Sequence, residues 1–179
     1  MGSVGPVTCG SGAESNVYFT KGLKMRSFKK AAKIGTLVLV AALAVAQAFR
    51  IEKTNPPVQS DIRADASVKH ILKRSCYDCH SNETVWPWYS NVAPVSWLIA
   101  DDVNGGRKKV NFSEWGNYPG GTQKRKLEEI GEEVAEGNMP LPIYTIMHRN
   151  AGLSQEERSH IKNWTQEAVA KALATNSTN

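Results

Sequence analysis

Residues 76–80 read Cys76-Tyr-Asp-Cys79-His80, the most informative stretch of the chain. With three Cys and four His in 179 residues, this pattern is expected by chance roughly once in a thousand such chains. Two thiols three residues apart can add to the two vinyl groups of one haem, and the adjacent His then lies on the same side to bind the iron. The spacing predicts one covalent c-type haem on Cys76 and Cys79, with His80 as an axial iron ligand.

Three other chemistries use similar residues. A structural zinc site needs a fourth ligand from a second pair, and the only other thiol, Cys9, lies beyond an apolar segment. A thiol-disulfide oxidoreductase places Cys-x-x-Cys at the start of a helix in a βαβ fold, whereas here a helix is expected before the motif and a Pro-rich loop after it. A structural disulfide has no use for His80. Covalent haem explains all three residues.

The iron of such a haem has a second axial position, and its occupant separates electron transfer from gas or peroxide chemistry. The candidates are Met139, Met147, His148, His160 and His70. We expect Met139, because it precedes Pro140 in a loop between two expected helices, where the rigid ring can hold the thioether. The alternative is a Met that only fills a gap in the core. Met147 is expected in the core, His148 at the surface or beside another ligand, and His70 and His160 away from the haem.

Aromatic residues are concentrated after the motif and are expected to cover the flat faces of the haem. They are Trp86, Trp88, Tyr89, Trp97, Phe112, Trp115 and Tyr118. The basic trio Arg107, Lys108 and Lys109 either neutralises the haem propionates or is a solvated surface. His80 should donate its other ring nitrogen to a backbone carbonyl in the loop from Pro87 to Pro94, because metal-bound imidazoles normally have such a partner.

The pattern after residue 50 is helical. Asp65 or Ser67 can cap a helix that presents Val68, Ile71 and Leu72 on one face and leads to Cys76. A second helix is expected over 95–103, ending at Gly105-Gly106. A third is expected over 122–136, with Leu127, Ile130 and Val134 facing the core and Gly137 ending the helix. A fourth is expected to begin at the capping box Ser154-Gln-Glu-Glu157 and to end at about Ala174. No alternating strand pattern appears. The expected fold is mainly α, a small c-type cytochrome-like helical domain around one haem.

The N-terminal part is of a different kind. Residues 1–33 hold six basic residues and one acidic residue, and so carry the whole net charge of +5. Residues 34–49 contain no charge, and Arg50 follows. Because basic residues remain on the cytoplasmic side of such a run, the excess charge indicates membrane topology and not a nucleic-acid partner.

A run of sixteen uncharged residues fits either a retained anchor or a cleaved signal peptide. A helix that spans the membrane takes about 20 apolar residues, and the apolar region of a signal peptide takes about 7–15. We expect a single-pass inner-membrane helix with the later residues in the periplasm; the alternatives are cleavage near Ala46, which leaves a soluble periplasmic protein, and a buried core helix. Met25 begins a more ordinary signal and is the expected start. Thr54-Asn-Pro-Pro-Val58 is a stiff spacer, so the chain divides into 1–33, 34–49, a linker at 50–64 and a haem-binding domain at 65–175.

Longer strings of residues resemble the bacterial haem-binding domain family, small envelope proteins related to single-haem c-type cytochromes. They include Cys76-Tyr-Asp-Cys-His-Ser-Asn-Glu-Thr84, Trp86-Pro-Trp-Tyr-Ser90, Val92-Ala-Pro-Val-Ser-Trp97, Asn111-Phe-Ser-Glu-Trp115 and Gly137-Asn-Met-Pro-Leu141. The resemblance covers roughly residues 54–165. It implies haem on Cys76 and Cys79 with His80 proximal, and Met139 stands at the Met-Pro place of similar sequences. Asp101-Asp102 stands where similar sequences often carry a His.

The expected function is that of a one-electron carrier between redox proteins of the bacterial envelope, not an enzyme. No residue constellation supports substrate turnover. Two alternatives assume an open sixth position on the iron: a haem-based sensor or ligand-binding module, and a haem peroxidase.

Overall fold

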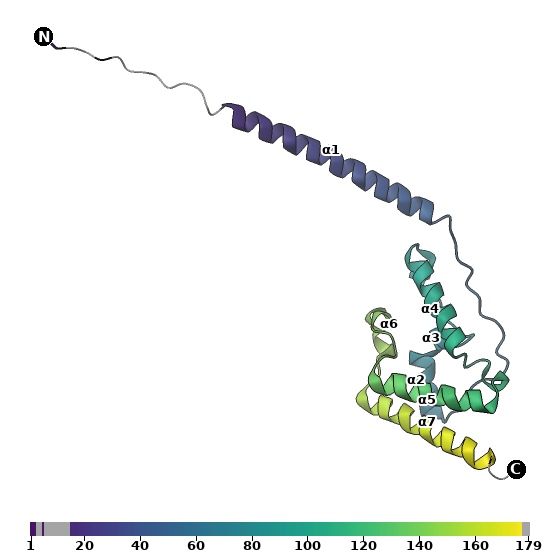
Figure 1. Ribbon diagram of the computed structural model, residues 1–179. Helices are drawn as coiled ribbons and strands as arrows, with labels where there is room; N and C mark the ends of the chain where they lie inside the picture. The colour runs from purple at the N-terminus through teal and green to yellow at the C-terminus, as the bar shows by residue number, and fades with distance from the viewer. Residues whose placement is uncertain (3–4, 6–14, 177–179) are drawn as a thin grey trace. The chain divides into compact units, whose positions relative to one another are not determined.

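The computed structural model describes residues 1, 2, 5 and 15–176, which belong to two units, Met1–Phe49 and Arg50–Asn179 (Figure 1). All regular elements of the described residues are helices, apart from one isolated parallel bridge between Ser60 and Glu114. The first unit holds α1, Ser15–Ala46. The second holds α2 (Ala66–Ser75), α3 (Tyr77–His80), α4 (Val95–Lys109), α5 (Gly120–Glu136), α6 (Pro142–Met147) and α7 (Gln155–Asn176), with short 3₁₀ turns at Trp88–Asn91, Trp115–Asn117 and Arg149–Ala151. The predicted mainly helical class is confirmed.

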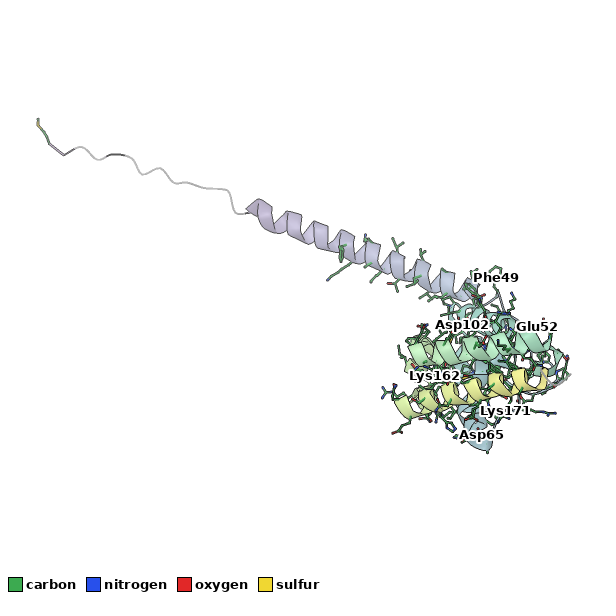
Figure 2. All side chains as sticks on the ribbon, turned by 60° about the horizontal axis from the view of Figure 1, so that its bottom comes forward. Phe49, Glu52, Asp65, Asp102, Lys162 and Lys171 are labelled. Carbon is green, nitrogen blue, oxygen red and sulfur yellow. The ribbon has the colours of Figure 1, made fainter. Side chains whose placement is uncertain are left out.

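The uncharged run at 34–49 is helical as far as Ala46. Its large apolar side chains are exposed, and Figure 2 shows side chains projecting from both sides of the α1 ribbon. Of the helices in the described ranges, none is both long and apolar enough to cross a membrane. The choice between an anchor and a signal therefore stays a prediction. Cys9 lies outside the described residues.

The core of the second unit begins with α2. The carboxylate of Asp65 accepts hydrogen bonds from the backbone N–H groups of Ser67 and Val68, so the predicted cap is confirmed. Val68 and Leu72 are fully buried against a cluster that includes Phe112. This helix places Cys76 directly after its last turn.

Helices α5 and α7 pack side by side along most of their length (Figure 1). Val134 of α5 meets Ile161 of α7 and Ile71 of α2 in a second buried cluster. The predicted ends hold: α5 stops at Gly137, whose φ of 84° is left-handed, and Ser154 and Glu157 form a reciprocal capping box at the start of α7.

Helix α4 is longer than predicted, and the expected end at Gly105-Gly106 is wrong. The helix continues to Lys109 because Gly106 lies against α3, where a helical residue without a side chain is required. A Cβ at Gly106 would lie 2.4 Å from the carbonyl oxygen of Cys79. Gly106 is therefore a packing residue inside α4.

The stretch from Thr54 to Ser60 is held against the rest of the second unit. The guanidinium of Arg107 donates to the carbonyls of Thr54 and Ser81 and to side-chain oxygens of Asn55 and Thr84. The side chain of Asn55 in turn donates to the carbonyl of Thr84, at 2.8 Å. Two roles were considered for Arg107, neutralising propionates or forming a solvated surface. The structure favours neither, because the N–H groups of the guanidinium are bonded to these neutral oxygens.

Replacing Gly106 by Ala should destabilise the protein by about 1–3 kcal/mol, because the new methyl group forces α4 away from the backbone of Cys79. Gly105→Ala is the matched control. A Cβ at Gly105 meets nothing within 4 Å, and Ala is the better helix former by roughly 0.5–1 kcal/mol, so this variant should be slightly stabilised. Urea denaturation of the two variants tests the contact, and equal midpoints would contradict it.

Candidate functional site

The two thiols of the motif are free and lie on one turn. Cys76 is the N-cap of α3 and Cys79 lies within it, both half-buried. Burial raises the pKa of the Cys76 thiol to about 12 and that of Cys79 to about 11, and the carboxylate of Asp102 adds to the second shift. Both sulfurs therefore carry their protons at neutral pH. Cysteines of thiol-disulfide oxidoreductases have lowered pKa values, so these two do not fit that class.

The imidazole of His80 is held through one nitrogen. Its Nδ1 lies 3.0 Å from the carbonyl oxygen of Gly106 and 3.2 Å from that of Val110, two acceptors that require a proton on Nδ1. Nε2 is then left with its lone pair. Burial lowers the pKa of His80, which keeps the ring neutral at pH 7. The predicted carbonyl partner exists, but its expected place at Pro87–Pro94 is wrong, because α4 folds its last turn over the motif.

Aromatic rings pack behind this imidazole. The ring of Phe112, which is 2% exposed, lies 6.0 Å from that of His80 and 5.3 Å from that of Tyr77. The backbone N–H of Phe112 also donates to the carbonyl of His80, at 2.7 Å. The turn after α4 thus restricts both the ring and the backbone of His80.

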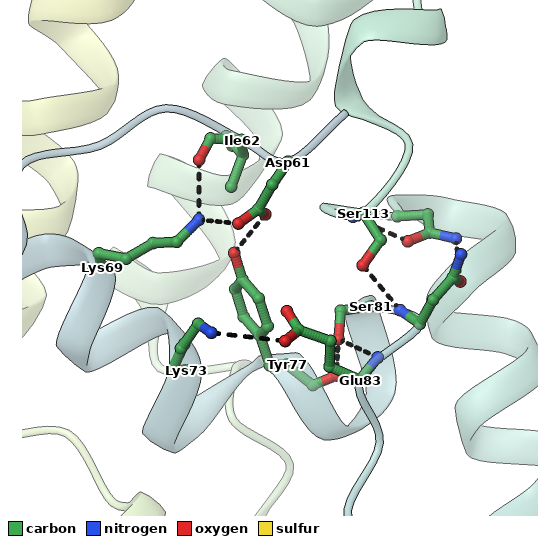
Figure 3. Close-up of polar contacts among 10 residues, drawn as sticks. Asp61, Ile62, Lys69, Lys73, Tyr77, Ser81, Glu83 and Ser113 are labelled. Carbon is green, nitrogen blue, oxygen red and sulfur yellow. Dashed lines mark hydrogen bonds and ion pairs between the residues drawn. The ribbon is translucent and has the colours of Figure 1, made fainter. Parts of the chain in front are cut away.

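Tyr77, the first residue between the two cysteines, is tied to the segment before α2 (Figure 3). Its hydroxyl donates to Asp61 Oδ1 at 2.6 Å, and Lys69 Nζ donates to Asp61 Oδ2 at 2.5 Å and to the carbonyl of Ile62 at 2.8 Å. Burial alone would raise the pKa of the Asp61 carboxyl, but the hydrogen bonds from Lys69 and Tyr77 outweigh it and lower the pKa. An ionised Asp61 therefore supports the fold around the motif.

Asp78, the second residue between the cysteines, holds two other segments. Its carboxylate accepts from the backbone N–H of Val85 at 2.9 Å and from the hydroxyl of Tyr144 at 2.7 Å. Its carbonyl accepts from Thr84 Oγ1 at 2.7 Å. Burial and the hydrogen bond to Asp78 raise the pKa of Tyr144, so it remains a donor. Helix α6 is thereby attached to the motif, a role for Tyr144 that the spacing of apolar residues did not reveal.

Met139 lies in the loop between α5 and α6, as predicted. Its half-buried side chain packs against the cluster of Ile71, Val134 and Ile161, and its carbonyl accepts from Arg158. The described contacts do not bring its sulfur to His80. Its role as an iron ligand stays a prediction.

The other candidate ligands are spread over the second unit. Met147 is 60% exposed, so its expected place in the core is wrong. The reason is that Tyr144, and not Met147, faces the motif. His148 stacks on the ring of Tyr144 at 4.2 Å and lies 3.2 Å from the hydroxyl of Tyr89. His70 and His160 are exposed, as expected.

The donor set fits a porphyrin better than a bare metal ion. Two thiols three residues apart and one imidazole with a free Nε2 match thioether attachment plus axial ligation. Within residues 1, 2, 5 and 15–176, no three side chains of His, Cys, Asp or Glu are grouped to hold a metal ion, which a structural zinc site would require.

The sequence model of a family described as a haem-binding domain matches residues 37–167, more than half of the chain. The match begins within α1 and ends within α7. No curated protein and no solved structure matches the chain.

Asp61→Asn should lower the free energy of unfolding at pH 7, by on the order of 1 kcal/mol because solvent screens this half-buried carboxylate. A lowered pKa in the folded state stabilises the protein above the ordinary value of 3.8, and this contribution is lost as the pH falls through and below that value. The difference between wild type and variant should therefore be smaller in acid than at pH 7. Denaturation at pH 7 and near pH 3 measures it, with the exposed Glu167→Gln as the charge control. A difference as large near pH 3 as at pH 7 would contradict this role.

Proposed function

The chain belongs to the haem-binding domain family, and on that premise we propose that it carries one covalent c-type haem and transfers single electrons in the bacterial cell envelope. Cys76 and Cys79 form the thioethers, and His80 is the proximal ligand. The observation that carries the proposal is the Nδ1–H of His80, which is bonded to two backbone carbonyls and directs Nε2 away from the protein backbone. The bound haem would supply the iron that changes oxidation state.

Attachment needs nothing beyond the two thiols and the two vinyl groups. Each S–H adds across one vinyl double bond: the sulfur bonds one carbon and the hydrogen goes to the other, so no atom or electron is gained or lost. Cys76 precedes α3 and Cys79 lies one turn later, which brings both sulfurs to one side of a short helix. The carbonyls of Gly106 and Val110 keep His80 in the tautomer that ligates iron through Nε2.

Met139 is the proposed sixth ligand, and a closed site of this kind suits electron transfer. The backbone at Met139 supports the assignment. The Met139 carbonyl accepts a hydrogen bond from Arg158 and Pro140 follows, so the loop is restricted at the residue that carries the sulfur. A second candidate function rests on the side chain, which packs against Ile71, Val134 and Ile161. If that packing persists with haem bound, the sixth position is open, and the protein is a sensor, a ligand-binding module or a peroxidase.

For location, we propose the periplasmic face of the inner membrane, with redox proteins as partners. Basic residues precede the uncharged run and the motif follows it, so export places Cys76 where c-type attachment takes place. The exposed apolar side chains of α1 at Leu37, Leu39 and Val45 support insertion or recognition as a signal. The protein is either retained by this helix or cleaved near Ala46. The N-terminal sequence of the mature protein distinguishes these two forms.

Purified full-length protein should retain one haem mass after denaturation and extraction with acidified organic solvent, because thioethers survive this treatment. The intact mass of the polypeptide measures it. Cys79→Ser should lose one thioether, and Cys76→Ser with Cys79→Ser should lose the haem. A wild-type mass without haem would refute covalent attachment.

Met139→Ala should convert a low-spin ferric spectrum to high spin and lower the reduction potential, because the thioether leaves the iron. The absorption spectrum, including the Met-to-iron charge-transfer band, measures the change. Met147→Ala is the matched control, since this side chain is 60% exposed on α6. An unchanged spectrum in Met139→Ala would refute the ligand, and a wild type that is already high spin and binds carbon monoxide would favour the second candidate function.

A further inference from the structure

Among the buried side-chain nitrogens and oxygens of the described residues, the indole Nε1 of Trp86 is the one without a hydrogen-bond partner. The ring as a whole is half-buried. An indole nitrogen can only donate, and leaving a buried donor unpaired costs about 1–3 kcal/mol. Such a cost in a native protein indicates that an acceptor comes from elsewhere.

Trp86 lies beside the haem-attaching turn. The two residues before it are bonded to Asp78, through the N–H of Val85 and the hydroxyl of Thr84. The loop that carries Trp86 is therefore fixed to Asp78, the second residue between the two cysteines.

A cation lies over the same ring. Lys53 Nζ is 6.0 Å from the centre of the Trp86 ring. Its hydrogen-bond acceptors are the neutral oxygens of Ser90, at 3.2 Å, and Asn91. None of the ion pairs formed by the described residues includes Lys53. Asn55, two residues further along, donates to the carbonyl of Thr84, which keeps this segment against the loop of Trp86.

An N–H donor that lacks an acceptor and an ammonium that lacks an anion together match a carboxylate. A haem held by Cys76 and Cys79 would carry two such carboxylates, its propionates. We propose that Trp86 Nε1 and Lys53 bind one haem propionate, Trp86 by a hydrogen bond and Lys53 by its charge. This inference rests on the proposed haem attachment and adds residues that neither the motif nor the basic trio at 107–109 contains.

The test uses the full-length protein matured with its haem. Trp86→Phe removes the N–H and keeps a ring, and Lys53→Met removes the charge and keeps the apolar stem. Each variant should shift the propionate bending band in the resonance Raman spectrum. Each should also lower the reduction potential, because a positive charge or a donor dipole near the haem disfavours the ferric state. Lys162→Met, an exposed lysine of α7 outside the residues expected at the haem, is the matched charge control and should leave both readouts unchanged.

The outcomes are separable from those for the proposed function. The haem mass of each variant is measured first, and a wild type without bound haem overturns the attachment itself. If haem is bound but Trp86→Phe and Lys53→Met leave both readouts unchanged, as Lys162→Met should, the inference is overturned, and water is then the partner of the indole. If Trp86→Phe does not fold, the result for Lys53→Met decides the inference. Lys53→Met should fold, because the ammonium it removes is bonded only to the neutral side chains of Ser90 and Asn91.

Discussion

The last turn of α4 holds the imidazole of His80, and the arrangement of the second unit depends on this contact. Gly106 contributes a carbonyl that accepts both from the N–H of Val110 within the helix and from His80 Nδ1. Carbonyl groups at a helix C-terminus carry partial negative charge, which favours a proton on the facing nitrogen and electron density on the other. The contact also requires α4 to approach α3 closely, and only a residue without a side chain permits that approach.

Local patterns in the sequence were reliable where the determining interaction is local. Asp65 caps α2 with its own carboxylate, Ser154 and Glu157 cap each other, and Gly137 takes the left-handed conformation that ends α5. Each of these depends on residues within a few positions. The buried face of Val68, Ile71 and Leu72 followed from helical periodicity in the same way.

The misplaced features are all set by contacts between distant segments. Two adjacent glycines ordinarily end a helix, but Gly106 continues α4 because Cys79 lies against it. The carbonyl partner of His80 is 26 residues away on that helix, and no local pattern shows which carbonyl it is. Tyr144 and Arg107 were equally hidden, since a tyrosine bonded to Asp78 and a guanidinium bonded to backbone oxygens look like ordinary surface residues in a sequence. A lone polar residue that is 26 or 66 positions from its partner gives no signal of this kind.

The two residues between the cysteines determine whether the motif could be transferred to another protein. Tyr77 reaches back to Asp61, and Asp78 reaches forward to Val85 and Tyr144. The positions that a consensus pattern writes as arbitrary are therefore those that join the surrounding chain to the turn. Grafting the pentapeptide onto another scaffold would transfer two sulfurs and a ring nitrogen, but not Asp61, Val85 and Tyr144, to which the two intervening residues are bonded.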